Sequence, residues 1–276
     1  MNNHPLKYFP EIMKSLYLGL KITLTGKPII IKDWNGVSFW QYKGDKIRFN
    51  LKRKSVTDAQ NVIKYIAANV QKGWTCVDIG ANIGAVSVYL WKYTGNKGKV
   101  FSIEADPNNI ERIKNNLEIN HLPSNKIIAA AIADRIGKMQ LRCYPDHNGW
   151  QTLGNPSFAL KFYSYLIEVP STTFENIAIQ NNLKNIDLIK IDVEGAELLV
   201  LNGMKKMLEE KRIRKIIFEV NPLMLEGMNK TVNELLVFWE GLDYTLFLLN
   251  ENGEIEQFNM WPDRYVGDCI AIVQNE

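Results

Sequence analysis

Three carboxylic acids stand close together in the run Asp192-Val193-Glu194-Gly195-Ala196-Glu197, directly after the mainly apolar residues 186–191. Carboxylates this close raise one another's pKa unless cations or hydrogen bonds compensate them, or unless one stays protonated. That cost indicates a functional site, to which we assign Asp192 and Glu194, whereas Glu197 is expected to be structural. A structural interpretation is compatible with this one: Asp192 would cap the following helix, and Glu194 and Glu197 would complement its positive end.

A second group of residues, Val77-Asp78-Ile79-Gly80-Ala81-Asn82-Ile83-Gly84, predicts a strand that ends in a tight turn and opens a helix. Gly80 and Gly84 let the chain bend sharply and let a ligand approach the main chain. Open α/β sheets bind ligands at such strand ends, although a glycine turn can also serve packing alone. A dinucleotide fingerprint would need glycine in place of Asn82. The pattern therefore disfavours a pyrophosphate and favours an adenosine cofactor without one.

Glu104 ends the next apolar segment, 20 residues after the second glycine of this turn. In nucleotide-binding α/β folds an acid at this place accepts hydrogen bonds from the ribose hydroxyls, because a carboxylate can accept from both. The alternative role is a helix cap, for which Asp106 in Asp106-Pro107 is better placed.

Asp134 follows another apolar segment. It could hydrogen-bond an adenine edge or be an ordinary turn residue, and the sequence leaves both open.

Two further residues are candidates for the substrate side of the site. Glu219 lies near the end of the segment 215–220, and it could line the substrate side or equally balance Lys215 or Arg214. His147 lies in an aromatic-rich stretch. A single histidine in a loop is more often a surface residue, but its ordinary pKa suits proton removal near neutral pH. We therefore keep Glu219 and His147 as candidate catalytic residues.

The elements that must position these residues are predicted to alternate along the chain. Apolar segments bounded by turn residues predict strands, over residues 75–79, 99–104, 126–131, 186–192, 215–220, 244–249 and 268–273. Apolar residues at helical spacing predict helices, over residues 58–70, 85–91, 108–120, 197–211 and 231–239. This alternation predicts a mostly parallel sheet with helices on both faces. Its last two strands could pair with each other in antiparallel fashion.

The first 55 residues depart from this alternation. They predict an amphipathic helix and three short strands, over residues 5–20, 28–31, 36–42 and 46–51. A β-rich preface of this kind is usually an appended edge or cap. We therefore divide the chain into an N-terminal extension, residues 1–55, and a main domain, residues 56–276.

Residues 143–170 also depart from the alternation, because they are irregular and rich in aromatic side chains. A long loop inside a compact domain is usually functional or disordered, and the aromatic content argues against disorder. We assign this stretch to substrate recognition.

The composition of the 276 residues is that of an ordinary soluble globular protein, with 46% hydrophobic and 23% charged residues. A net charge of +3 is too small to argue for a nucleic-acid partner. Lys14 and Lys21 bracket the apolar piece 16–20 too closely for a secretory leader or a membrane span. We therefore expect a cytoplasmic protein without stable membrane insertion. The cysteines lack metal-ligand spacing and are expected to be reduced core residues, namely Cys76, Cys143 and Cys269.

Three motifs together resemble those of a known family: the run 77–84, Glu104-Ala105-Asp106-Pro107, and Ile189-Lys190-Ile191-Asp192-Val193-Glu194-Gly195-Ala196-Glu197. They are similar to the motifs of FkbM-type S-adenosylmethionine-dependent methyltransferases, over a stretch of residues 56–225. The resemblance implies a seven-stranded class I methyltransferase fold in residues 56–276. It also implies S-adenosylmethionine as cofactor and O-methylation of a hydroxyl on a sugar, a glycan or a related natural product.

The resemblance further implies roles for individual residues. Cofactor binding is implied for Asp78, Gly80, Asn82, Gly84, Glu104, Asp134 and Asp192. Within this set, Glu104 would bind the ribose, Asp134 the adenine, and Asp192 would face the methyl-transfer centre. A sugar hydroxyl is a poor nucleophile and needs a base or a metal to ease proton loss. The candidates are Asp192, Glu194 and Glu219, as a base or as oxygen ligands for Mg²⁺, with His147 as a further base.

Other functions also fit a glycine turn in an α/β sheet. One is an NAD-dependent oxidoreductase, against which Asn82 counts, and another is a non-catalytic nucleotide-binding relative. A nucleic-acid methyltransferase is disfavoured by the nearly neutral charge. The expected partner is a small-molecule or glycan acceptor, and the sequence predicts no oligomeric state.

Overall fold

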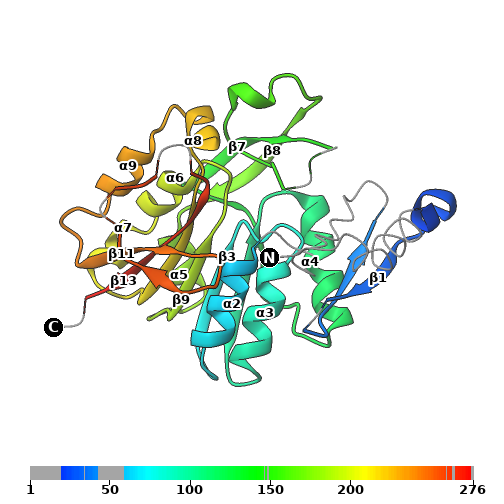
Figure 1. Cartoon of the computed structure of the whole chain (residues 1–276), viewed down its shortest axis with the longest axis horizontal. Coiled ribbons are helices and arrows are strands. Elements are labelled where there is room, and N and C mark those ends of the chain that lie inside the picture. The colour runs from blue at the N-terminus through cyan, green and yellow to red at the C-terminus, as the bar shows by residue number, and fades with distance from the viewer. Residues whose placement is uncertain are drawn as a thin grey trace, which may run out of the picture.

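The structure, a computed structural model, describes residues 20–33, 35–42, 59–145, 147, 149–258, 260–262 and 265–274. Its centre is one large sheet with helices on both sides (Figure 1). From one edge to the other, the strands are β12 (Ile255–Glu256), β11 (Tyr244–Leu249), β13 (Gly267–Val273), β10 (Lys215–Val220), β9 (Leu188–Ile191), β3 (Thr75–Ile79), β4 (Lys99–Glu104) and β5 (Ile127–Ala129).

The sheet is parallel from β10 to β5 and antiparallel on the other side. Strands β10, β9, β3, β4 and β5 pair in parallel. Strand β13 runs antiparallel between β10 and β11, so the last two long strands do pair with each other. The predicted mostly parallel, seven-stranded sheet is confirmed, and the two-residue strand β12 is added at its edge.

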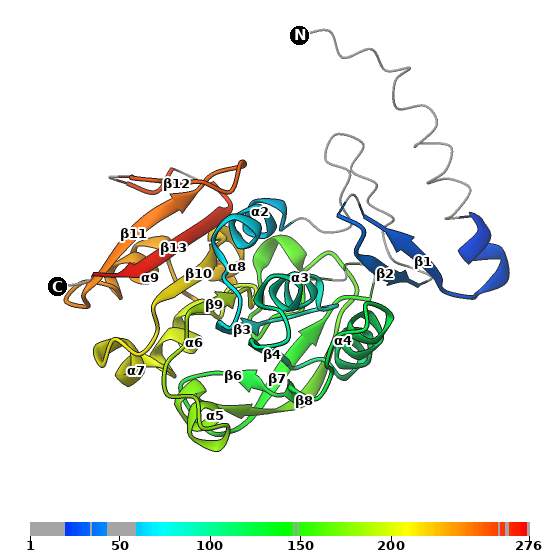
Figure 2. The ribbon, with the colours of Figure 1, turned by 90° about the horizontal axis from the view of Figure 1, so that it is seen from below.

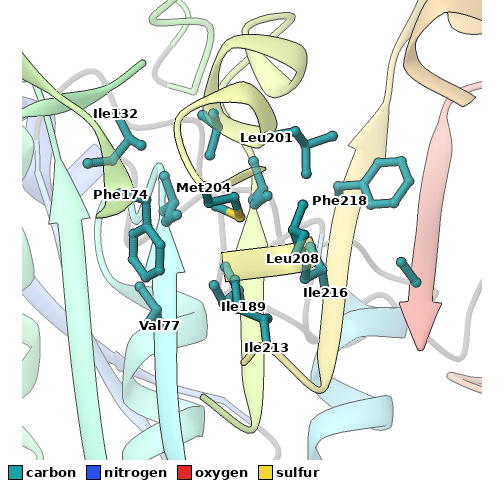
Figure 3. Close-up of a cluster of buried hydrophobic side chains, with 14 of the residues drawn as sticks. Val77, Ile132, Phe174, Ile189, Leu201, Met204, Leu208, Ile213, Ile216 and Phe218 are labelled. Atoms are coloured by element: carbon teal, nitrogen blue, oxygen red, sulfur yellow. The ribbon is translucent and has the colours of Figure 1, made fainter. Parts of the chain in front are cut away.

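Helices cover both faces of this sheet, as Figure 2 shows. One face carries α2 (Gln60–Asn69), α3 (Ala85–Thr94) and α4 (Pro107–Ile119). The other carries α5 (Phe174–Gln180), α6 (Glu197–Asn202), α7 (Lys205–Glu209), α8 (Pro222–Gly227) and α9 (Val232–Val237). Figure 3 shows part of the second core, where side chains such as Phe174 and Leu208 lie beside Ile189 and Ile216 of the strands.

The central strands contribute to both cores, because successive side chains of a strand point to opposite faces. In β3, Val77 and Ile79 belong to the core under α5 and α6, while Cys76 belongs to the core under α2 and α3. In β9, Ile189 and Leu188 divide in the same way. Each central strand is therefore buried on both sides.

Two smaller sheets flank the large one. The first contains β6 (Ala131–Ile132), β8 (Tyr165–Thr172) and β7 (Gly137–Cys143), in that order. The second is the antiparallel hairpin of β1 (Ile29–Lys32) and β2 (Ser38–Gln41), and residues 20–25 before it are helical.

Two asparagines, Asn116 in α4 and Asn120 at its C-cap, hold this hairpin against the main domain. The Asn120 side chain accepts a hydrogen bond from the Ser38 N–H at 2.9 Å and donates one to the Ser38 carbonyl at 2.7 Å. Asn116 accepts from the Trp40 N–H at 2.9 Å and donates to the Ile83 carbonyl at 2.8 Å. These side chains satisfy backbone hydrogen-bonding groups at the edge of β2, as a neighbouring strand would. Asn116 also connects the hairpin to the glycine turn.

Some elements differ from the prediction. The helix predicted over residues 197–211 is two helices, α6 and α7, and Gly203 lies between them. A Cβ on Gly203 would lie 2.1 Å from the Ala133 carbonyl oxygen, so the close approach of the two backbones requires glycine between the helices. The strand predicted over residues 126–131 is divided between β5 and β6.

The aromatic-rich stretch is less irregular than predicted. Residues 165–170 belong to β8, because they pair along their length with β7. The irregular part is shorter, residues 144–164, and we call it the aromatic segment. The predicted helix over residues 5–20 falls almost entirely outside the described residues, and the predicted strand over residues 46–51 does so completely.

All three cysteines are buried and unpaired, as the sequence predicted. Within the described ranges, the helices are too short or too polar to cross a membrane.

Gly80 provides a test of this architecture. It has φ +75°, and a Cβ added to it would lie 1.8 Å from the Asp192 carbonyl oxygen. We expect Gly80→Ala to force apart the ends of β3 and β9. This overpacking should lower the free energy of unfolding by roughly 3 kcal/mol or more, in addition to the loss from backbone strain. The control is Gly241→Ala, since Gly241 has φ +79° with open space around it, and strain alone should cost about 1–2 kcal/mol. Urea unfolding of both variants measures the difference, and equal losses would contradict the close approach.

Candidate active site

A cavity of about 500 Å³ opens at the carboxyl ends of the parallel strands. Its walls come from the ends of β3, β4, β9 and β10, from the glycine turn, and from the aromatic segment. Gln41 at the end of the N-terminal hairpin and Arg112 of α4 line it as well. Parallel strands bring their carboxyl ends to one sheet edge, and this edge is the usual ligand site of such folds.

The glycine turn forms the floor of the cavity. The Gly80 and Ala81 N–H groups both donate to the Ile103 carbonyl at 3.0 Å, which fixes the turn against β4. Gly80, Asn82 and Gly84 all have positive φ, from +51° to +81°. Glycine adopts such values without strain and asparagine tolerates them, so these three residue types follow from the shape of the turn.

Glu104 joins this turn to the end of β4. Its Oε2 accepts from the Asn82 N–H at 2.7 Å, and its Oε1 accepts from the N–H groups of Ala105 and Asp106 at 2.8 Å each. Burial raises the pKa of Glu104 to about 7 in spite of these three donors. Asp106 accepts from the Asn108 N–H at 2.9 Å and caps α4, as the sequence predicted. Glu104 is therefore not the helix cap, and its carboxylate lies on the cavity wall.

A row of polar side chains crosses the sheet beneath the cavity, on the face covered by α3. The Ser102 hydroxyl bonds to the Ser87 hydroxyl at 2.8 Å, and Ser87 donates to Asp78 at 2.5 Å. Burial, the largest influence, raises the pKa of Asp78 to about 6. Asp78 is the register partner of Lys190 in the next strand, so the row continues there.

Lys190 is the buried cation of this row, with its side chain 2% exposed. Its ammonium lies 3.1 Å from an Asp268 oxygen and 3.4 Å from an Asp192 oxygen, and it donates to the Ile191 carbonyl. Burial opposes the charge, but the carboxylates of Asp192, Asp268 and Glu219 outweigh it and raise the pKa of Lys190. The ammonium therefore stays charged and compensates the acids around it.

The acids above Lys190 form one cluster. Single carboxylate oxygens of Asp192, Glu194 and Glu219 lie within 4.8 Å of one another, and all three residues line the cavity. Burial, followed by the charges of its acidic neighbours, raises the pKa of Glu194 well above its ordinary value. The pKa of Glu219 is raised for the same reasons. The prediction that these acids share one sheet edge is thus met by the geometry.

Glu197 holds the turn between these acids, as its structural assignment predicted. Its side chain is fully buried and accepts from the Val193 and Gly195 N–H groups at 3.3 and 3.2 Å. Burial raises its pKa to about 7. Helix α6 has Ala196 as its N-cap and no side-chain cap. The alternative in which Asp192 caps this helix is therefore wrong.

The aromatic segment supplies a wall of stacked rings. His147 stacks on Trp150 with centroids 4.1 Å apart, and Phe162 meets the edge of His147 at 4.4 Å. Phe158 packs edge-on against Trp150 at 5.3 Å. His147 and Trp150 line the cavity. The structure thus brings His147 to the same cavity as the acids, within a ring cluster.

Two predicted site residues do not line the cavity. Gly84 lies in the glycine turn, where a Cβ would lie 3.2 Å from the Ile113 side chain of α4, and Asp134 lies elsewhere. It is an exposed residue after β6, its carboxylate is 3.6 Å from the Arg135 guanidinium, and it does not line this cavity. This position agrees with the turn role, and the adenine role of Asp134 stays a prediction. The nearby residues 130–132 line the cavity instead.

Sequence reasoning missed several residues of the site. Lys190 and Asp268 stand in strand segments that were interpreted only as apolar, and Thr152 and Gln41 belong to no motif. For Lys190 a signal existed, because a lysine between isoleucines in a doubly buried strand needs a buried anion. Asp268 could be paired with it only once the strand order was known.

Removing the buried ammonium tests the charge balance of the cluster. We expect Lys190→Met to lower the free energy of unfolding by about 3–5 kcal/mol, because it leaves buried carboxylates uncompensated. The control is Lys138→Met, which removes an exposed pair with Glu168 and should change stability little. Urea unfolding at neutral pH measures both. An unchanged midpoint for Lys190→Met would show that the acids need no buried cation.

Comparison with known proteins identifies the family of this chain. Residues 78–246, more than half of it, match the model of the methyltransferase FkbM domain. Methyltransferase sdnD of Sordaria araneosa is 28% identical over 167 residues, 51% of this chain and 64% of that protein. The 2-O-methyltransferase NoeI of Sinorhizobium fredii is 28% identical over 149 residues, 49% of this chain and 59% of that protein. The alignments thus span less than two thirds of these relatives.

Among solved structures, a putative SAM-dependent methyltransferase from Streptococcus mutans aligns with a TM-score of 0.48 at 15% identity, over 89% of this chain and 55% of that one. The family match contains the glycine turn, Glu104 and the acidic run, and it is offset from the predicted span of residues 56–225. With its α/β class I methyltransferase fold, the chain belongs to the FkbM methyltransferase domain family.

Proposed function

We propose that this protein is an S-adenosylmethionine-dependent O-methyltransferase that acts on a hydroxyl of a sugar, a glycan or a related natural product. The observation that carries the proposal is the acid cluster of Asp192, Glu194 and Glu219 on the wall of the same cavity as the glycine turn and Glu104. A group that accepts a proton thus lies beside a predicted cofactor site. Neither an NAD-dependent oxidoreductase nor a non-catalytic relative is needed to explain these residues.

The residues of the cavity fit S-adenosylmethionine. Within the part of the chain that the structure describes, Glu104 Oε2 accepts one hydrogen bond, from the Asn82 N–H, which leaves it acceptor capacity for a ribose hydroxyl. The Asn82 Oδ1 is buried with no hydrogen-bond partner in the described part of the chain, so it can accept from the cofactor's ammonium. Gly80 and Asp78 line the cavity as well.

The bound cofactor would supply an activated methyl group on its sulfonium. The chain would then place the acceptor oxygen in line with it, exclude water and take the proton. Asp192 is the proposed base, since it lines the cavity, with its carboxylate 3.4 Å from the Lys190 ammonium. Glu194 and Glu219, whose pKa values are raised, can hold a proton and hydrogen-bond neighbouring hydroxyls. His147 is the second candidate base.

Two features favour a hydroxyl on a ring-shaped acceptor. Trp150 and His147 present stacked rings to the cavity, and flat aromatic faces suit the apolar faces of a sugar ring. The relative NoeI is named as a 2-O-methyltransferase, so its methyl acceptor is an oxygen. A nucleic-acid acceptor remains disfavoured by the net charge of +3.

A divalent cation is a second possibility for the acid cluster. Three carboxylate oxygens within 4.8 Å offer the donors that Mg²⁺ prefers. The nearby Lys190 ammonium already compensates part of this charge, which favours the base role. The methyl-transfer experiment below includes an arm that separates the two.

Two organisational predictions stay proposals. The division at residue 55 separates the hairpin from the main domain, yet Gln41 of β2 lines the cavity, so the extension contributes to the site. We also propose a cytoplasmic location, with which three buried, unpaired cysteines agree.

Cofactor affinity is expected to depend on pH through Glu104. With a pKa of about 7 in the free protein, Glu104 is protonated below that pH and loses acceptor capacity toward the ribose. Affinity for S-adenosylhomocysteine should therefore be constant above about pH 7 and fall by up to about tenfold per pH unit below it. Isothermal titration across this range measures it. Glu104→Gln should bind weakly with a flatter profile, and a wild-type profile equally flat would contradict the role of Glu104.

Methyl transfer tests the proposed base. The wild type should move labelled methyl from S-adenosylmethionine to a member of a panel of methyl glycosides. Asp192→Asn should lower kcat by roughly 10²–10⁴-fold while retaining cofactor binding. The matched control is Asp187→Asn, near the opposite end of β9, where Asp187 pairs with Arg214 at 3.2 Å. It should keep wild-type kcat.

Three outcomes would change this proposal. A folded wild type that binds no S-adenosylmethionine would exclude the cofactor. Full activity of Asp192→Asn with lost activity of His147→Gln would move the base to His147. Loss of activity in EDTA that Mg²⁺ restores would assign the acids to a metal.

A further inference from the structure

Thr152 is the point where the aromatic segment is joined to the acid cluster. It is 1% exposed, and its N–H and carbonyl pair with those of Arg142 in β7 at 3.1 and 2.8 Å. Its hydroxyl donates to the Glu194 carbonyl at 2.6 Å and accepts from the Gly154 N–H at 3.0 Å. One side chain thus connects the small sheet, the aromatic segment and the turn that carries Glu194.

That turn needs to be held, because its backbone is unusual. Glu194 has φ +52°, a left-handed conformation uncommon for a residue with a side chain, and Gly195 follows with φ +100°. Glu197 holds one side of the turn through the Val193 and Gly195 N–H groups. Thr152 holds the other side through the Glu194 carbonyl. The direction in which the Glu194 side chain leaves the backbone therefore depends on both contacts.

The residues just before Thr152 lie against the rest of the cavity. Trp150 and Gln151 line it, and the Gln151 amide lies 3.4 Å from an Asp106 oxygen beside Glu104. A Cβ on Gly149 would lie 3.4 Å from the Asn82 side chain. Residues 149–152 therefore run from the predicted ribose side to the acids, where Thr152 contacts the Glu194 carbonyl.

We infer that Thr152 is a positioning residue, which sets the Glu194 carboxylate against an acceptor held by the aromatic segment. The inference rests on the proposed function and names a residue that no motif contains. The hydroxyl-to-carbonyl hydrogen bond fixes the backbone of Glu194 relative to the aromatic segment.

Two substitutions at Thr152 separate the hydroxyl from the volume of the side chain. Thr152→Val keeps the shape and removes the donor, so kcat on the methyl glycoside found above should fall by roughly 10- to 100-fold. Its KM, and its Kd for S-adenosylhomocysteine, should change by less than about threefold, since neither the ring wall nor the glycine turn is altered. Thr152→Ser keeps the donor and should restore kcat to near the wild-type value.

A double-mutant cycle shows whether Thr152 acts through Glu194. In a Glu194→Gln background, Thr152→Val should lower kcat little further, because the group that it positions is already altered. Hydrogen exchange gives a readout that needs no acceptor: the peptide over residues 193–196 should exchange faster in Thr152→Val than in the wild type or Thr152→Ser.

The outcomes separate this inference from the proposed function. No methyl transfer by the wild type would remove the proposed function, whereas unchanged hydrogen exchange in Thr152→Val would overturn the Thr152 contact by itself. An active wild type with equal kcat in Thr152→Val would overturn the inference alone. Equal, additive losses in the double mutant would do the same. If Thr152→Val does not fold, Thr152→Ala takes its place. If neither folds, Thr152 is a structural residue and the inference fails.

Discussion

The acidic side of the cavity depends on the buried ammonium of Lys190. Asp192 and Asp268 lie within 3.4 Å of it, and Glu219 is close enough to influence its pKa. Carboxylates gathered at neighbouring strand ends would otherwise repel one another and favour protonation. Because Lys190 stands in the middle of the sheet, the strand pairing that assembles the acids also fixes their counter-charge. The pairing register of the strands therefore determines both where the acids lie and how their charge is compensated.

The two faces of the sheet differ in polarity. Toward α5 and α6 the central strands present a continuous apolar core. Toward α3 the same strands carry Ser102, Asp78 and Lys190 side by side, still buried. Burying so many polar groups is tolerable only because each meets a hydrogen bond or a charge. The polar row ends at the cavity, so the polar residues of the site are continuous with those buried in the sheet.

The cavity is completed by segments that lie outside the alternating strands and helices of the main domain. The hairpin reaches the cavity through Gln41 and is held to α4 by asparagine side chains. The aromatic segment provides the ring wall and meets the acids through Thr152. The proposed cofactor side is thus built by the conserved topology of an open α/β sheet, whereas the proposed acceptor side is built by loops and an extension.

The sequence by itself determined the order of most strands and helices, the glycine turn, and the nearness of Glu104, Asp192, Glu194 and Glu219, because strand periodicity and a shared sheet edge follow from local pattern. It also determined that Asp106 caps α4. Only the tertiary structure decided that Lys190 pairs with Asp268, since the two residues are 78 positions apart and their strands are separated in the sheet by β10. It likewise excluded Asp134 from the cavity and broke the predicted helix at Gly203. Contacts between distant segments carry no local signature, so residues such as Thr152 become visible only when the chain is folded.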